Sequence, residues 1–139
     1  MTSRLVTFRL EDRWYALDVS AVQEVLRGLP LTRVPLAPPA VAGLINLRGQ
    51  VVTAVDLRRR LGLGPRGEDH EQMLVVLRRA GDQVALLVDG IGSVVPAEPD
   101  RFEPPPGTAA AADRGLVLGV YQQPDHLLLL LDVDRAVAA

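Results

Sequence analysis

Side chains that could carry out chemistry are few in this chain and lie far apart. It has no cysteine, which excludes thiol catalysis, disulfide bonds and cysteine-ligated metals. Its two histidines, His70 and His126, show no metal-ligand spacing, and Ser3, Ser20 and Ser93 do not stand in a nucleophile-elbow pattern. The parts of a hydrolase triad are therefore missing. We expect no catalytic residue and no bound metal.

Four aspartates have a structural explanation. Asp18, Asp56, Asp89 and Asp132 each follow an apolar segment, where a carboxylate can accept hydrogen bonds from the backbone of a turn or a helix start. The glycine-rich segment 62–67 resembles a phosphate-binding loop only weakly, because it lacks a Lys-Ser or Lys-Thr pair and follows an expected helix. With no cofactor motif left, we predict a protein that acts through its surface, without a cofactor and without enzymatic activity.

Composition limits the partners. The chain has 139 residues, a net charge of −2 and only 4% aromatic residues. A net charge this small does not predict a nucleic-acid or membrane partner, and scarce aromatics disfavour a base-stacking surface. The leucine run at 127–131 is far shorter than the roughly 20 residues that span a bilayer, and the N-terminus lacks the apolar core of a signal peptide. We expect a cytoplasmic protein without nucleic-acid binding or direct membrane insertion.

The order of apolar segments and turn residues predicts a mainly β fold. Expected strands lie at 5–10, 14–17, 31–34, 43–47, 50–56, 73–77, 84–88, 91–95, 115–121 and 127–131, and expected short helices at 19–26, 57–61 and 133–137. Polar or proline-rich connections are expected at 62–71, 96–106 and 107–113. The two halves, about 1–65 and 66–139, follow a similar order. This similarity predicts one domain, 1–139, made of two small β-barrel subdomains that share a core, with or without exchange of a terminal strand.

Residues 43–58 form the most informative segment. Branched side chains on both sides of an Arg-Gly pair predict a β-hairpin with a tight turn, followed by a short helix. Alternation along the first strand would place Asn46 and Arg48 on one face and Ile45 and Leu47 on the other. An arginine on a stiff hairpin tip suits contact with a carboxylate of a partner, although a structural salt bridge is the alternative.

Glu24 and Phe102 are two further features of the predicted surface. Glu24 lies on the polar side of its expected helix, where it is either a solvated residue or a contact. Phe102 begins a proline-stiffened loop, and it can either pack back onto its own domain or anchor a partner. Together with Arg48, these features predict a rigid β scaffold that carries binding loops.

Several motifs in order resemble the CheW family of chemotaxis scaffold proteins. They are Tyr-Ala-Leu-Asp at 15–18, Val-Gln-Glu-Val at 22–25, Asn-Leu-Arg-Gly at 46–49, Asp-Leu-Arg at 56–58, Val-Asp-Gly at 88–90 and the segment 102–106. The resemblance covers about residues 8–137. It implies two five-stranded β-barrel subdomains that share a core, and an adaptor that couples methyl-accepting chemoreceptor cytoplasmic tips to the regulatory domain of a CheA-type histidine kinase.

The resemblance also implies two binding surfaces and a location at membrane receptor arrays. The receptor surface would contain Val22, Glu24, Asn46 and Arg48, and the kinase surface Phe102, Glu103, Pro104 and Pro106. Other functions remain open at this point. The chain could be a CheW-like scaffold of a pilus or gliding motility pathway, a regulatory module of a larger kinase or scaffold, or a β-barrel enzyme or small-ligand carrier.

Overall fold

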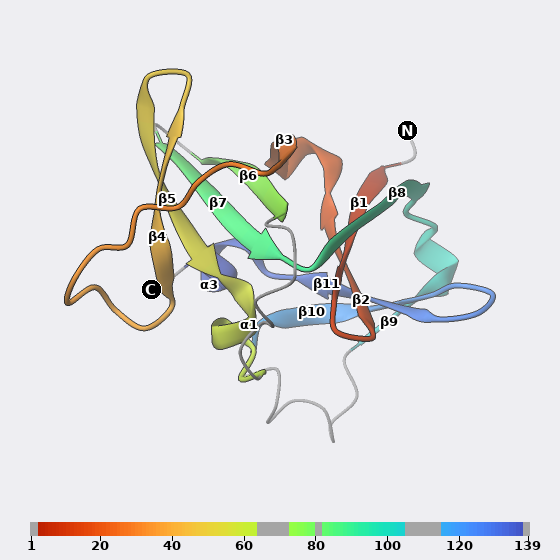
Figure 1. Cartoon of the computed structure of the whole chain (residues 1–139). Coiled ribbons are helices and arrows are strands. Elements are labelled where there is room, and N and C mark those ends of the chain that lie inside the picture. The colour runs from red at the N-terminus through yellow and green to blue at the C-terminus, as the bar shows by residue number, and fades with distance from the viewer. Residues whose placement is uncertain (1–2, 64–72, 80–81, 105–114, 138–139) are drawn as a thin grey trace.

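The computed structural model of the 139-residue chain describes residues 3–63, 73–79, 82–104 and 115–137 (Figure 1). Their backbone forms two sheets, and the predicted mainly β fold with a few short helices is confirmed. The first sheet has the order β8 (Gly90–Pro96), β1 (Arg4–Leu10), β2 (Arg13–Asp18), β11 (Leu127–Leu131), β10 (Val117–Gln122), β9 (Phe102–Glu103). The second has the order β3 (Val22–Arg27), β6 (Met73–Arg79), β7 (Asp82–Val88), β5 (Gln50–Asp56), β4 (Val41–Leu47).

Each sheet takes strands from both halves of the sequence. In the first sheet β2 lies parallel to β11, and in the second β5 lies parallel to β7, whereas the other neighbouring strands are antiparallel. A parallel pair needs a crossover connection, so it joins strands that are distant in the chain. The six-stranded and five-stranded sheets therefore do not coincide with residues 1–65 and 66–139.

The helix expected at 19–26 is wrong. Asp18 does cap a turn, since its carboxylate accepts from the backbone N–H of Ser20 at 2.9 Å, but only a 3-10 turn, η1 (Val19–Ala21), follows. The next residues are strand β3, which pairs with β6. Hydrogen bonds to a strand about 50 residues away override the weak helical pattern of so short and Val-rich a segment.

The strand expected at 31–34 is reduced to one bridge. Thr32 exchanges two backbone hydrogen bonds of 2.8 Å with Leu44, and its neighbours are not in a strand. The prolines around this segment remove donors that a longer ladder would need. Most of the connection expected at 62–71, including His70, and all of the loop expected at 107–113 lie outside the described residues.

A buried apolar cluster joins the two sheets. Its largest members include Phe8 and Tyr15 of the first sheet and Leu77 and Leu86 of the second, all fully buried. A smaller cluster lies under the β4–β5 hairpin, where Ile45 and other apolar side chains of the second sheet pack. Burial of this apolar surface is the main favourable term in folding, so the sheets hold each other in place.

The helices are short, and the two starts predicted after Asp56 and Asp132 are observed. Asp56 accepts from the N–H of Arg58 at 3.0 Å at the start of α1 (Leu57–Arg60), and Asp132 accepts from the N–H of Arg135 at 3.3 Å in α3 (Val133–Val137). A second 3-10 turn, η2 (Pro99–Arg101), precedes β9. Among the described residues, no helix is long and apolar enough to cross a membrane.

Candidate partner-binding surfaces

The β4–β5 hairpin ends in a two-residue turn. Its residues, Arg48 and Gly49, have φ angles of +51° and +86°, the pattern of a type I′ turn. The N–H of Gly49 also donates to the side-chain oxygen of Asn46 at 3.0 Å. The side chain of Asn46, the second-last residue of β4, therefore braces the turn. The tip extends beyond the rest of the second sheet (Figure 1).

The predicted alternation along β4 is confirmed for three of its four residues. Ile45 and Leu47 are buried in the second core cluster, and Asn46 is exposed on the other face. Arg48 differs, because it lies in the turn and not in the strand. Its direction is set by the left-handed backbone of the turn.

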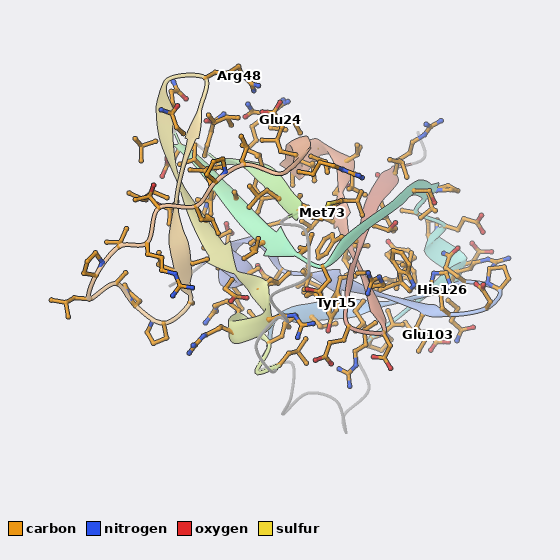
Figure 2. The ribbon with its side chains drawn as sticks, in the orientation of Figure 1. Tyr15, Glu24, Arg48, Met73, Glu103 and His126 are labelled. Carbon is orange, nitrogen blue, oxygen red and sulfur yellow. The ribbon has the colours of Figure 1, made fainter. Side chains whose placement is uncertain are left out.

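The structure brings Arg48 and Glu24 together. The guanidinium of Arg48 donates to the carboxylate of Glu24, which lies on β3 at the opposite edge of the second sheet. The side chain of Arg48 is 63% exposed and that of Glu24 is 25% exposed. Figure 2 shows both at the same end of the molecule. Much of the cation is thus open to a partner. Val22, at the start of β3, is half-buried against the main core.

Next to this pair lies a polar hollow that sequence reasoning missed. It has a volume of about 220 Å³ and is lined by Gln23, Leu47, Arg48, Gln50 and Gln83. The side-chain amide of Gln83 donates to that of Gln23 at 2.7 Å, across 60 residues of sequence. No local motif in the sequence signals a meeting of residues so far apart.

The other predicted surface lies on the first sheet. β9 is an edge strand of two residues that pairs with β10. Phe102 packs against Tyr121, with ring centroids 4.9 Å apart and planes tilted by 56°, yet it remains 39% exposed. The two possibilities expected for Phe102 are therefore combined, because one part of the ring packs on its own sheet and another part faces outward.

Glu103 and Pro104, which follow Phe102, lie in the described part of the predicted kinase surface. Glu103 accepts from the side-chain amide of Gln122 at 2.8 Å, and Pro104 is exposed. Pro106 lies outside the described residues. Figure 2 places Glu103 far from Arg48, so the two predicted surfaces lie apart on the molecule.

The remaining reactive side chains have simple surroundings. The ring of His126 lies 2.6 Å from the carboxylate of Asp125 on an exposed hairpin, and the hydroxyl of Ser20 donates to Asp18 at 2.7 Å. Within the ranges that the structure describes, no three His, Cys, Asp or Glu residues are grouped so that they could hold a metal ion. What the described surface offers is polar and apolar contact groups on rigid strands.

Comparison with known proteins gives a consistent result. The model of the CheW-like domain family matches residues 4–139. "Chemotaxis protein CheW" of Rhizobium meliloti (strain 1021) is 30% identical over 130 residues, which cover 94% of this chain and 84% of that protein. The protein of the same name from Helicobacter pylori (strain ATCC 700392 / 26695) is 28% identical over 133 residues, covering 95% and 79%.

A solved structure agrees. The crystal structure of the scaffolding protein TtCheW from Thermoanaerobacter tengcongensis matches with a TM-score of 0.85 and 30% identity, covering 95% of this chain and 90% of that one. The match extends over both sheets, and the sequence-based prediction of a chemotaxis scaffold is confirmed. The chain therefore belongs to the CheW-like domain family and is a non-catalytic coupling adaptor of bacterial chemotaxis.

Proposed function

We propose that this protein couples the cytoplasmic tips of methyl-accepting chemoreceptors to the regulatory domain of a CheA-type histidine kinase. It would act in the cytoplasm, recruited to membrane receptor arrays. Receptor binding is assigned to Val22, Glu24, Asn46 and Arg48, and kinase binding to Phe102, Glu103, Pro104 and Pro106. Membership of the CheW-like family supports this role, and the separation of the two surfaces on one molecule fits it.

The observation that carries the proposal is the position of Arg48. A non-glycine residue in the left-handed region costs on the order of 1 kcal/mol, and a type I′ turn favours Asn, Asp or Gly. The exposed pair with Glu24 returns only about 0.2–1 kcal/mol. Folding therefore gains little or nothing from an arginine here. A cation that the fold does not need, held on a stiff tip and largely exposed, fits a role in binding.

Three hollows lined by described residues have volumes of about 220–280 Å³, below the roughly 300–1,000 Å³ of small-molecule sites, so these three suit side chains of a protein partner better than a small ligand. Coupling then depends on differential contacts. A receptor movement changes kinase activity only if this adaptor and its partners interact differently in the two states.

The test uses a CheA-type kinase and a chemoreceptor tip fragment from the organism that encodes this chain. Pull-down and kinase autophosphorylation are followed in the same samples, with and without the tip fragment. The wild type is expected to bind both partners and to give receptor-dependent activation. Arg48→Glu should keep its fold, checked by circular dichroism and melting, and should lose this activation because it places two carboxylates together.

The outcomes separate the assignments. If the folded wild-type protein binds neither partner, the adaptor proposal is wrong. If it binds both and Arg48→Glu activates the kinase as well as the wild type does, only the role of Arg48 is wrong. If the protein instead couples a receptor of a pilus or gliding pathway to the same class of kinase, kinase activation should occur with the tip fragment of that receptor and not with that of a chemotaxis receptor.

A further inference from the structure

The polar hollow beside Arg48 is lined mainly by uncharged amide side chains. Three glutamines line it, from three strands: Gln23 on β3, Gln83 on β7 and Gln50 on β5. Leu47, which is buried, also lines it. Strands fix the positions of all these residues. The hollow is thus a rigid feature with several amide groups around a small volume of about 220 Å³.

The hydrogen bond between two of the glutamines gives the hollow a direction. Gln83 donates its side-chain N–H to the side-chain oxygen of Gln23 at 2.7 Å. The amide nitrogen of Gln23 and the amide oxygen of Gln83 make no further hydrogen bond to the described residues. N–H groups of both glutamines and the amide oxygen of Gln83 therefore remain unused, and a ligand group that engages both kinds must itself offer an acceptor and a donor.

The charges in the hollow select between the possible groups. Arg48 and Glu24 together carry no net charge, and the other residues that line the hollow are uncharged. A carboxylate from a partner would approach Glu24 and would face the amide oxygen of Gln83, which cannot donate to it. A carboxamide meets neither problem. Its oxygen can accept from Gln23, and its nitrogen can donate to Gln83.

We infer that this hollow binds the side-chain carboxamide of an asparagine or glutamine that projects from the receptor tip helix. Gln23 and Gln83 then set its specificity by a reciprocal pair of amide hydrogen bonds. The inference rests on the proposed receptor-binding function of Glu24 and Arg48, next to which the hollow lies. It adds partner chemistry and residues to that surface.

The experiment measures the dissociation constant of the receptor tip fragment with this full-length protein by calorimetry. Gln83→Met and Gln23→Met keep side-chain length and remove the amide. Each is expected to weaken binding by about 2- to 12-fold, the worth of one hydrogen bond. Gln83→Glu keeps the shape of the side chain and removes its N–H donors, so weaker binding by this variant cannot come from a change in packing. Gln123→Met, on the distant β10–β11 hairpin, is the matched control and should bind as the wild type does.

A double-mutant cycle identifies the partner group. Each asparagine and glutamine of the tip fragment is changed to an apolar residue of similar size, and each change is combined with Gln83→Met. One tip position should lose affinity in the wild type but lose much less in the Gln83→Met background, since the two groups act as a pair. Melting curves of every variant check that the fold is kept.

Two failures are distinct. If the wild type binds the tip fragment, and both methionine variants bind it with unchanged affinity or no tip amide couples to Gln83, the carboxamide pocket is wrong and the adaptor function stands. If the wild type does not bind the tip fragment, the receptor-binding function itself falls, and the pocket falls with it.

Discussion

Arg58 and Asp89 form a bidentate ion pair in the interior of the protein. The guanidinium of Arg58 donates to the two carboxylate oxygens of Asp89 at 3.0 and 2.6 Å, and the two side chains are only 8% and 2% exposed. Glu11, in the β1–β2 turn, joins them, because its N–H donates to Asp89 at 2.8 Å and its carboxylate accepts from Arg58 at 3.1 Å. The ion pair and Glu11 therefore connect the β1–β2 turn of the first sheet to α1, which follows β5 of the second sheet.

Removing one partner of this pair should be strongly destabilising. We expect Asp89→Ala to lower the free energy of unfolding by about 3–5 kcal/mol, because it leaves the buried cation of Arg58 without its main partner. Urea denaturation measures the loss. Arg79→Ala is a matched control, since it breaks a pair with Asp134, which is 85% exposed, and should cost less than about 1 kcal/mol. An equal loss in both variants would show that burial does not matter here.

The pH dependence of stability should change when the arginine is replaced by lysine. Its hydrogen bonds to the carboxylate of Asp89 raise the pKa of Arg58 above its usual value, although burial opposes them. A group whose pKa is higher in the folded than in the unfolded state stabilises the fold at every pH below its unfolded pKa. This contribution is lost only when the pH rises above that value, so the wild type keeps it through the alkaline range.

In Arg58→Lys the ammonium has a pKa of about 10.4 in the unfolded chain. We expect the free energy of unfolding of this variant to fall, relative to the wild type, over the range above about pH 10.4, where the lysine loses its proton and its pair with Asp89. Urea titrations at a series of pH values compare the two proteins. Parallel curves across that range would mean that the charge at position 58 does not contribute to stability.

A substitution at the tip of the β4–β5 hairpin should abolish receptor coupling without much change in the free energy of unfolding. Arg48→Asn places a residue that tolerates left-handed φ angles next to Gly49, and so gives the preferred sequence of a type I′ turn. We expect its free energy of unfolding to stay within about 1 kcal/mol of the wild type, because the lost ion pair is exposed. Receptor-dependent kinase activation should nevertheless be lost. An Arg48→Asn protein that activates the kinase normally would remove Arg48 from the receptor surface.

The kinase surface can be displaced by one methyl group. A Cβ atom on Gly119 would lie 2.2 Å from a ring carbon of Phe102 and 2.7 Å from the backbone oxygen of Glu103. Gly119→Ala should therefore push β9 away from β10, cost about 1–3 kcal/mol of stability and weaken kinase binding. Receptor binding should be kept, since the hairpin tip belongs to the other sheet.

The control for Gly119→Ala is Leu118→Ala on the same strand. Leu118 is half exposed, so its truncation removes little packing. This variant should bind the kinase as the wild type does. Normal kinase binding by Gly119→Ala, in a protein that is still folded, would contradict the assignment of Phe102 and Glu103.

The sequence by itself determined the elements that depend on interactions between neighbouring residues. The β4–β5 hairpin follows from branched residues around Arg48 and Gly49, and the helix starts after Asp56 and Asp132 follow from side chains that cap the next turn. The mainly β fold could also be predicted from the sequence. The order of motifs predicted the family. These features need interactions only over a few residues, or a pattern that repeats along the chain.

Tertiary structure decided the rest. β3 is a strand and not a helix because β6, distant in sequence, supplies its hydrogen bonds. Both sheets mix strands from the two halves, which a linear comparison of the halves could not show. Arg48 meets Glu24, Arg58 meets Asp89, and Gln83 meets Gln23 across 24, 31 and 60 residues. Side-chain contacts of this kind depend on which strands become neighbours, and that is set by burial of the shared core and not by any local pattern.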